Sequence, residues 1–538
     1  MNAFFVTQSG SLDLLHGLME RLAGPLELDR TGFFVTDSLF FRRFASGRTG
    51  LAESKDVLKE WELMAEALAR REPLAKDRIL LESLDERSGR PSVVWEALFC
   101  DRRLMLGNLC RWRPDYVPRF NHEELIRIAA RLVGATEDAF DRIQPDALFS
   151  LVPVSFGEYL IWAVAKARGI PSFYLTPTKI ENRMFWADHF FGQATTVVDR
   201  FHTLQQGAVF SDSVGEAQAY LATATRDGPQ YEGMIPVPGT IRTQRKARRR
   251  PLLKRLKGLL RAELEYRCTA QGDNHIPGFL LPAWHSRVII PLRARAHAVK
   301  LRREYLSARD LPNANYVFFP LNSEPEISLS IQSKPYVNQI EAVRSVARSL
   351  PIGMELFVKE HPRSIGYRSL AYYRKLLRIP NVRLVDPSVE SPKVIEHSQM
   401  VISVWSFVGF EALLSKIPVI VLGTPSFTML PNSMVRAISD INTLPRHVSE
   451  LLKGYQFDQE ALENYVAACI DCSVPIDFYS LFLGKKDRLM GSDVVRSEAH
   501  SEEWARQMGL LVDYTVSSVN EQLRCGLESN SRIIGDSN

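Results

Sequence analysis

The hydrophobic pattern in the first part of the chain alternates between short apolar runs and amphipathic stretches. Residues 4–7 and 32–37 are apolar runs of strand length, and residues 12–22 carry apolar side chains at helical spacing. Residues 52–140 show mainly helical periodicity. A strand, a helix and a second strand then follow as a βαβ unit at 145–152, 156–168 and 172–175. The pattern predicts an α/β domain with a helical insertion.

A second alternating series begins at Asn315, and helices over 337–350 and 392–398 separate its strands. The predicted strands are 316–320, 355–359, 381–385, 400–404 and 418–422. Helical connections between strands predict a parallel sheet, and ligands of such sheets bind at the carboxyl ends of the strands. We therefore expect the functional site around His361 and between Ser403 and Glu411.

Residues 241–310 interrupt the α/β pattern with a strongly basic segment. The run 242–250 holds six basic residues, and the leucines of 252–260 recur near helical spacing among cations. A basic amphipathic helix of this kind can lie on an anionic membrane surface. It can equally be a solvated helix whose leucines pack on a neighbouring domain. The apolar stripe is short, so membrane contact would be peripheral and sensitive to salt.

Length and composition fit a globular protein of two or three domains. The chain has 538 residues, of which 45% are apolar. Its net charge of +5 and pI near 8.8 do not favour nucleic acid as a partner. The sequence shows no uncharged apolar run of about 18 residues and no basic leader with a cleavage site. We expect a cytoplasmic location.

The cysteines and several missing motifs argue against disulfide-stabilised, zinc-binding and several nucleotide-binding and hydrolytic classes of site. Six cysteines are too scattered for a disulfide framework, and the single CxxC at Cys469 and Cys472 lacks further zinc ligands, so both are expected to be structural. The sequence contains no P-loop, GxGxxG, HExxH or GxSxG motif. It also contains no Asp-x-Asp, the usual carboxylate device for holding a metal on a nucleotide diphosphate. We therefore expect no metal site and no cofactor.

One ordered set of motifs resembles a known family. The segments "FFPLNSEPE", "FVKEHPRSIGYRS", "IPNVRLVDP" and "VISVWSFVGFEALLSKIPVIVLG" resemble those of bacterial capsular and surface polysaccharide biosynthesis proteins with a GT-B glycosyltransferase fold. The set is also similar to the Kdo and sialic acid transferases that carry a His-Pro motif. The resemblance covers residues 311–430 well. In the N-terminal half it depends only on "DALFS…GIPSFYL" and "TKIENRMFW".

The resemblance implies a GT-B-like α/β fold, in which two Rossmann-like domains face a cleft and a helical connector joins them. We assign residues 1–240 to an N-terminal acceptor-side domain with a helical insertion and 241–310 to a basic helical connector. Residues 311–445 are assigned to a C-terminal nucleotide-sugar-binding domain, and 446–538 to C-terminal helices and a flexible tail whose last dozen residues are expected to be disordered.

The predicted donor site begins with His361, which directly follows a strand. Lys359 and Arg363 lie beside it, and a histidine in this setting can hydrogen-bond the phosphate of a leaving nucleotide. The alternative is that the His-Pro pair only fixes the turn, because proline restricts the preceding residue to extended geometry. The charged neighbours favour a ligand role.

Further donor-binding candidates lie where another strand turns into a helix. Ser403, Ser406 and Gly409 could form an anion site with the free amides of the helix start, or Ser406 could be a cap and Gly409 a packing residue. Trp405 departs from the small residue that the family's loop would lead us to expect. In the family Glu411 would accept the ribose hydroxyls, although a carboxylate there could also compensate the helix dipole.

Acidic residues complete the set of candidates. Glu324 and Glu326 lie in the loop after the first strand of the second series, where one of them could contact the sugar or base, or both could be solvated. An inverting transferase also needs a carboxylate base on the N-terminal half, at a strand end. Asp13, Asp37 and Glu158 are the candidates by position, and each could instead be a cap or a surface acid.

The function predicted from these features is metal-independent transfer of a sugar from a nucleotide-activated donor to a capsular or surface polysaccharide, or to a lipid-linked glycan. A CMP-linked donor is one option. The leaving phosphate would be neutralised by His, Arg, Lys and helix-start amides. Two alternatives stay open: a nucleotide-sugar 2-epimerase of the same fold, and a non-catalytic polysaccharide assembly or export factor. Peripheral contact with the inner membrane accompanies the cytoplasmic location as a further option.

Overall fold

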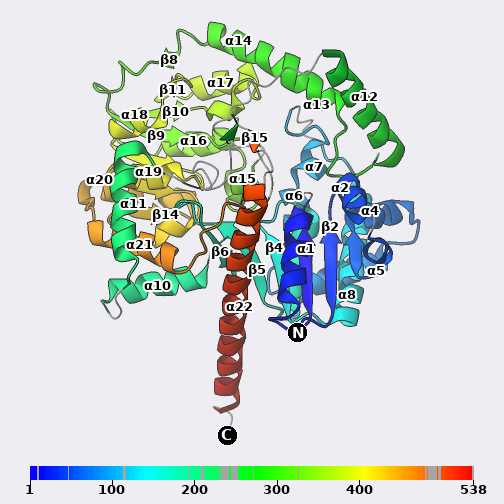
Figure 1. The fold of residues 1–538 in the computed structure, drawn as a ribbon. Helices are drawn as coiled ribbons and strands as arrows, with labels where there is room; N and C mark the ends of the chain where they lie inside the picture. Colours follow the sequence, from blue (N-terminus) through cyan, green and yellow to red (C-terminus); the bar gives the residue numbers. More distant parts are fainter. Residues whose placement is uncertain are drawn as a thin grey trace.

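A computed structural model describes most of the chain and shows two α/β domains bridged by an arc of helices (Figure 1). The described residues are 1–8, 11–46, 48–112, 117–192, 194–207, 211–229, 231, 242–243, 252–270, 272–324, 326–478, 482, 493–494 and 498–535. Most of the basic run 242–250 and part of the turn at 8–11 lie outside them.

The N-terminal domain contains a six-stranded sheet in the order β3-β2-β1-β4-β5-β6, in which only β6 runs antiparallel to its neighbour. Almost every strand residue is buried, as expected for a sheet that helices cover on both faces. The strands are β1 Ala3–Thr7, β2 Thr31–Val35, β3 Val57–Lys59, β4 Ala147–Leu151, β5 Ser172–Pro177 and β6 Met184–Ala187. The order 3-2-1-4-5 is that of a Rossmann fold.

The helices of this domain include the predicted insertion between β2 and β4. They are α1 Ser11–Leu22, α2 Ser38–Ala45, α3 Thr49–Glu53, α4 Glu60–Ala69, α5 Ala75–Arg87, α6 Val93–Cys100, α7 Arg102–Leu106, α8 His122–Ile143 and α9 Phe156–Ala167. The sequence pattern did not predict β3, because three residues within a helical region leave no detectable alternation.

The C-terminal domain contains a seven-stranded parallel sheet in the order β14-β13-β12-β9-β10-β11-β8. Counted from β9, this is again the order 3-2-1-4-5-6, with β8 added at one edge. The strands are β8 Tyr305–Leu306, β9 Tyr316–Pro320, β10 Glu355–Lys359, β11 Val382–Val385, β12 Met400–Ser403, β13 Val419–Val421 and β14 Val435–Ala437. Two Rossmann-like domains are thus confirmed.

Short helices connect these strands. They are α15 Ile327–Ser330, η2 Lys334–Tyr336, α16 Gln339–Ala347, η3 Pro362–Ser364, α17 Leu370–Leu377, α18 Ser391–Glu396, α19 Val408–Leu414, η4 Ser426–Met429, η5 Ile441–Thr443 and α20 Leu444–Gly454. One buried apolar cluster extends from Phe4 in the first sheet to Phe318 in the second, so the two domains share a core.

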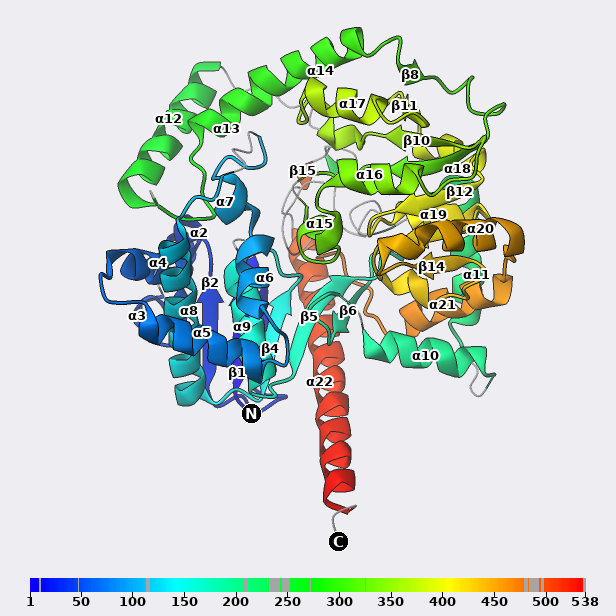
Figure 2. The same ribbon diagram turned by 180° about the vertical axis from the view of Figure 1, so that it is seen from behind.

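The connector passes over both domains on one side of the molecule, as Figures 1 and 2 show. It consists of α12 Leu252–Thr269, α13 Leu280–Trp284, the π-helical turn η1 His285–Ile289 and α14 Ile290–Lys300. Asp273 accepts a hydrogen bond from Ser38 N at the end of the first sheet (2.8 Å). At the other end, a Cβ on Gly366 would lie 2.5 Å from Ile290 O, so α14 packs directly on the C-terminal domain.

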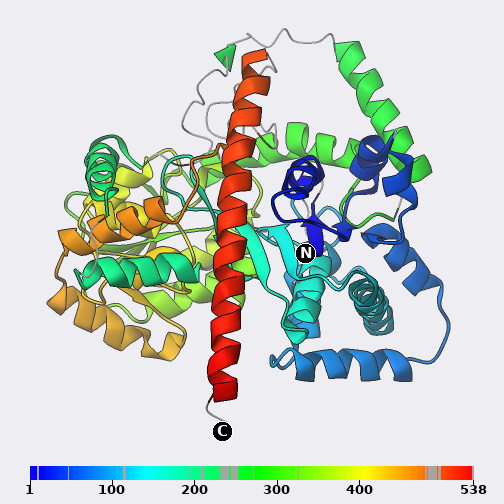
Figure 3. The ribbon, with the colours of Figure 1, turned by 60° about the horizontal axis from the view of Figure 1, so that its bottom comes forward.

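Packing crosses the predicted domain boundaries. Helices α10 Thr195–Gln205 and α11 Val214–Asp227 pack on α21 Gln459–Asp471, on the C-terminal side. The long helix α22 Glu498–Gly535 packs on α1, where Trp504 and Met508 lie against Gly17 (Figure 3). A small antiparallel pair joins β7 Arg242–Thr243 to β15 Asp493–Val494. Helix α22 ends at Gly535, and the expected disorder of the last dozen residues stays a prediction.

Candidate functional site

The C-terminal sheet reverses its strand order between β9 and β12, and ligands of such sheets bind at this point. Asn322 follows β9 and holds the two strand ends together, because its Nδ2 donates to Val404 O (2.8 Å) and to Ser328 Oγ (3.1 Å). Asn322 is buried, yet its Oδ1 accepts no hydrogen bond within the described part of the chain. A buried acceptor without a donor is costly, so this oxygen is an unsatisfied polar atom at the strand ends.

The turn from β12 into α19 carries the predicted serines. The Ser403 side chain is fully buried, and its Oγ has no hydrogen-bond partner among the described residues. Ser406 Oγ accepts from Val408 N (3.3 Å), as a cap would. Trp405 between them has a φ of +37°, a strained left-handed conformation that often occurs at functional turns.

Gly409 is a packing residue in this geometry. A Cβ at its position would lie 2.9 Å from Phe427 Cζ, so only glycine lets α19 approach this ring. Helix α19 has seven residues, and its dipole is correspondingly weak. The binding capacity of this turn therefore lies more in its side chains than in the helix start.

Glu411 and Lys359 form the charged centre of the site. Burial raises the pKa of Glu411 to about 7, and the nearby Lys359 ammonium only partly opposes the rise. Burial in turn lowers the pKa of Lys359, against the raising effect of Glu360, Glu411 and Asp386. The Lys359 Nζ also donates to Ser391 Oγ (3.4 Å). A half-titrated carboxyl beside a buried ammonium can accept hydroxyl groups and balance a phosphate charge.

His361 lies at the mouth of the same strand ends and is partly exposed. Its backbone N donates to Glu360 Oε1 (2.7 Å), and Ser364 N donates to its carbonyl oxygen (2.8 Å). The 3-10 turn η3 is tied to the loop after β9 by a hydrogen bond between Ser323 Oγ and Ser364 Oγ (2.8 Å). The predicted His361, Lys359, Ser403, Ser406 and Glu411 are thus brought to one edge. The Arg363 side chain lies outside the described part.

Arg368 supports this edge, and the sequence analysis did not assign it a role. Its guanidinium is buried, pairs with Glu360 and reaches Glu324 (3.3 Å), while Tyr373 OH donates to Glu360 Oε2 (2.7 Å). Burial would lower the pKa of Arg368, but the carboxylate of Glu360 more than offsets this and raises it. Glu324 is therefore held by the protein itself. Glu326 is exposed.

The candidate bases lie at the edge of the N-terminal sheet, and two of them are engaged. Both Glu158 oxygens are used: one accepts from Gln8, the other from Val154 N (2.6 Å) and Ser155 N (2.8 Å). Burial raises the pKa of Glu158 to about 7. Asp37 caps α2 by accepting from Phe40 N (2.8 Å). Asp13 is exposed in the first turn of α1.

A second ion pair in this region was also missed. His275 of the connector binds the buried Glu60 carboxylate, with 2.8 Å between Nε2 and Oε1. Burial alone would lower the pKa of His275, but Glu60 more than offsets this and raises it. No spacing signal could have found the pair, because the two residues are 215 positions apart.

Lys334 links the two domains. Its Nζ donates to Glu96 Oε2 (2.7 Å) and to Tyr159 OH (2.8 Å), so a residue of η2 in the C-terminal domain is bound to α6 and α9 of the N-terminal domain. Arg90 Nε donates to the same Glu96 oxygen (2.7 Å). Burial would raise the pKa of Glu96, but the bonds from Arg90, Lys334 and Tyr159 hold it at about 2.

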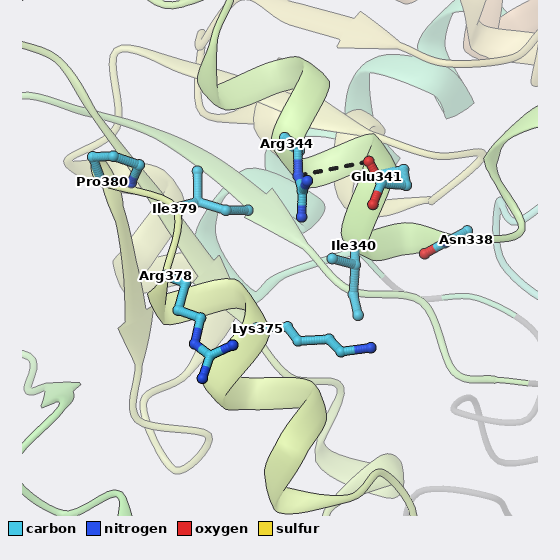
Figure 4. Close-up of a pocket in the computed structure, with 8 residues that line it drawn as sticks. All are labelled: Asn338, Ile340, Glu341, Arg344, Lys375, Arg378, Ile379 and Pro380. Atoms are coloured by element: carbon cyan, nitrogen blue, oxygen red, sulfur yellow. Dashed lines mark ion pairs between the residues drawn. The ribbon is translucent and has the colours of Figure 1, made fainter.

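Two cavities lie elsewhere on the surface. One, of about 590 Å³, lies between α16 and α17, and Figure 4 shows its lining with Arg344 paired to Glu341 (3.6 Å). The other, of about 680 Å³, is an apolar groove that includes Trp95 and Phe99 of α6. Neither is lined by the strand-end residues. Among the described residues no group of three or more His, Cys, Asp and Glu side chains could hold a metal ion, and every helix is too short or too polar to cross a bilayer.

Comparison with solved structures gives distant likenesses. The "beta Kdo 2,4 transferase" KpsC of Thermosulfurimonas dismutans is 13% identical over 60% of this chain and 79% of its own, with a TM-score of 0.32. The UDP-GlcNAc 2-epimerase of Neisseria meningitidis is 10% identical over 88% and 99%, with a TM-score of 0.23. WaaG, a glycosyltransferase involved in lipopolysaccharide biosynthesis, is 17% identical over 38% and 52%, with a TM-score of 0.21. The fold class therefore depends on the strand order described above.

Comparison of the sequence is more specific. No curated protein matches the chain. The model of the family described as "Capsule polysaccharide biosynthesis protein" matches residues 292–459, a range that contains β9 to β14 and all of the C-terminal strand-end candidates. The match covers less than a third of the chain.

Proposed function

We propose that the protein is a glycosyltransferase that moves a sugar from a nucleotide-activated donor to a capsular or surface polysaccharide, or to a lipid-linked glycan. The observation that carries the proposal is that Lys359 lies near Glu411 at the carboxyl edge of the C-terminal sheet, where β12 ends at Ser403 and His361 follows β10. These groups lie inside the range that matches the capsule family. A cation, an imidazole, a hydroxyl and a carboxylate suit a phosphate and a ribose.

In this proposal the protein's own cations stabilise the leaving nucleotide without a metal ion. Lys359 and His361 bind the phosphate on which negative charge develops. Glu411 accepts hydrogen bonds from the ribose hydroxyls when it is ionised. The buried Arg368 and Glu360 position the turn that holds His361. CMP, UDP and GDP are the donor nucleotides to distinguish.

The acceptor hydroxyl must lose a proton as the new bond forms. Among Asp13, Asp37 and Glu158, the last two bind backbone amides that an acceptor would have to displace. Asp13 follows the end of β1 and is exposed, so it is the carboxylate that an acceptor can reach. We assign it the role of base. Asp13→Asn should keep nucleotide binding and lose transfer.

Nucleotide binding tests the donor site directly. Thermal shift and calorimetry with CMP, UDP and GDP should show stabilisation by one of them, and His361→Ala should weaken its affinity by about tenfold to a hundredfold, as expected for a lost charge-assisted hydrogen bond. His397→Ala is the matched control, since His397 lies just before β12 at the opposite edge of the sheet. If none of the three nucleotides binds, the transferase proposal fails and a non-catalytic assembly factor is the better description.

Turnover distinguishes the remaining alternative. An epimerase acts on the donor alone, whereas a transferase needs an acceptor. Incubation of the bound nucleotide-sugar without acceptor, followed by chromatography of the sugar, should show no isomer. An isomer that forms without acceptor would replace the transferase by the 2-epimerase.

A further inference from the structure

The helical connector presents an unusual concentration of exposed apolar side chains. Among the described residues, twelve large apolar side chains are strongly exposed, and seven of them lie on α12, α13 and α14. They are Leu256, Leu260, Leu264, Leu281, Trp284, Leu292 and Val299. The exposed leucines of α12 recur every four residues and therefore form one stripe along that helix.

The exposed side chains of α14 lie on the face that points away from the protein. Ile290 and His297, seven residues apart, are buried, and the His297 ring packs on Tyr373 with 5.4 Å between centroids. Leu292 and Val299 each follow a buried residue by two positions, which is about 200° around a helix. They are 55% and 76% exposed. The inner face of α14 is thus used for packing while the outer face is apolar and unpartnered among the described residues.

The same segment carries the positive charge of the molecule. Residues 242–303 contain 17 lysines and arginines and three acids, although the whole chain has a net charge of only +5. Each acid is turned to a protein partner: Glu263 accepts from Phe279 N (2.8 Å), Glu265 from Arg43 (3.1 Å) and Asp273 from Ser38 N (2.8 Å). The outward charge of the connector is therefore positive.

We propose that the outer surface of α12, α13 and α14 docks on an anionic phospholipid bilayer. Leucine and tryptophan side chains enter the headgroup boundary, and basic side chains such as Lys257, Arg261, Arg287 and Arg295, which are exposed, bind the lipid phosphates. The contact is peripheral, since each apolar stripe is only a few residues long. This inference goes beyond the proposed transfer reaction and does not depend on it.

Charge argues against a protein partner on this surface. Interfaces between proteins are depleted of charged residues at their centre, and a second copy would bring two strongly basic surfaces together. Alternating leucines and cations instead match a bilayer surface, which offers apolar depth and anionic phosphate within the same layer. Helices α12 and α13 lie outside the range that matches the capsule family, whereas most of α14 lies inside it.

The docked surface is adjacent to the candidate donor site. Helix α14 packs against Gly366, five residues after His361, and the loop after α12 is bonded to the carboxyl edge of the N-terminal sheet through Asp273 and His275. A bilayer bound to the connector would therefore lie beside both strand-end regions. A lipid-linked acceptor would reach the enzyme from that side.

Sedimentation with vesicles tests the proposal. The full chain should pellet with vesicles of phosphatidylcholine containing about one third phosphatidylglycerol, and not with phosphatidylcholine alone, and raising the salt concentration should weaken the binding. Leu260→Ser with Leu264→Ser should reduce the bound fraction at least tenfold. Ile79→Ser with Ile352→Ser removes two even more exposed apolar side chains elsewhere and should have no effect.

The electrostatic part has its own pair of variants. Lys257→Gln with Arg261→Gln should weaken pelleting, while Lys76→Gln with Arg78→Gln on the exposed face of α5 should not. All changes are at exposed positions, so thermal midpoints should stay within about 2 °C of the parent. The proposal is overturned if the connector variants and their control variants pellet equally well with anionic vesicles. The surface is instead assigned to a second copy if two results are found together. The parent does not bind vesicles, and light scattering shows a dimer of the parent that the leucine variant has lost. Thermal stabilisation of the same variants by nucleotide shows whether the donor site is intact, so loss of vesicle binding can be distinguished from failure of the donor site.

Discussion

The two sheets share one strand order, but the polar side chains at their reversal points have different hydrogen-bond partners. At the N-terminal sheet, Gln8 bridges to Val152 O and Glu158, and Glu158 caps α9, so the polar groups bind one another. At the C-terminal sheet, Ser403 Oγ and Asn322 Oδ1 have no partner among the described residues, and Glu411 is buried beside Lys359. Buried hydroxyls without a partner among the described residues also occur at the N-terminal edge, at Thr36 and Ser38 after β2. The two edges therefore differ chiefly in their carboxylates: Glu158 is held by backbone amides and Gln8, whereas Glu411 lies near the Lys359 ammonium.

Removal of the Arg368 guanidinium should give the largest effect at the C-terminal edge. Arg368→Met leaves the buried carboxylate of Glu360 without its cation, and breaking such a pair costs about 3–5 kcal/mol of unfolding free energy. Urea unfolding followed by tryptophan fluorescence measures the loss. Arg383→Met breaks an exposed pair with Glu355 (3.6 Å) and should change stability little. Equal effects of the two changes would show that the Arg368 network does not hold this edge.

The next largest effect is expected at the N-terminal edge. Glu158→Ala removes the acceptor of two backbone amides and of Gln8, and should cost about 2 kcal/mol of stability without changing nucleotide affinity. Glu123→Ala changes an exposed acid in the first turn of α8 and is the control. A stable Glu158→Ala protein that binds nucleotide but fails to transfer sugar would instead make Glu158 the base.

The pH dependence of nucleotide binding sharpens the comparison. The raised pKa of Glu411, about 7, means that the carboxyl is mostly protonated at pH 6 and ionised at pH 8. If the ionised form accepts the ribose hydroxyls, affinity should rise about tenfold between these values. Glu411→Gln should abolish this rise, and the same variant corrects for titration of the nucleotide itself. Parallel pH profiles for the two proteins would remove Glu411 from the ribose site.

The contact between the domains should give the smallest effect. Lys334→Met removes one of the groups that hold the pKa of Glu96 at about 2, and because Glu96 is partly exposed we expect a loss of about 1 kcal/mol or less at pH 7. A carboxyl group whose pKa is lowered by folding stabilises the folded state at pH values above the ordinary pKa of that group. The difference between variant and parent should therefore shrink as the pH falls from about 4 toward 2. Lys393→Met, at an exposed pair, is the control.

The sequence predicted the parallel strands and the donor-side residues because each is marked by local pattern. Long apolar runs ending in His361 or Ser403 identify strand ends without any tertiary information. Strands β3 and β14 were missed because each has three residues and neither lies in a longer apolar run, as the equally short β13 does.

The supporting contacts could not be predicted, since they join distant positions. Glu60 binds His275 and Glu96 binds Lys334 across more than 200 residues, and no periodicity records such pairs. Arg368 lies within a quoted motif, but its role depends on burial that only the folded chain shows. The assignments of His361, Glu411 and Asp13 to donor and base remain predictions.

The docking of α22 on α1 has a consequence for biosynthesis. Val474, Ile476, Met508, Leu511 and Val519 share a buried cluster with Leu12, Leu15 and Leu18, so a segment that is synthesised late completes a domain that is synthesised hundreds of residues earlier. Until α22 has been synthesised, one apolar face of the N-terminal domain stays exposed, and chaperones can bind such a face during translation. A protease cut in the connector would for the same reason leave two fragments that stay associated.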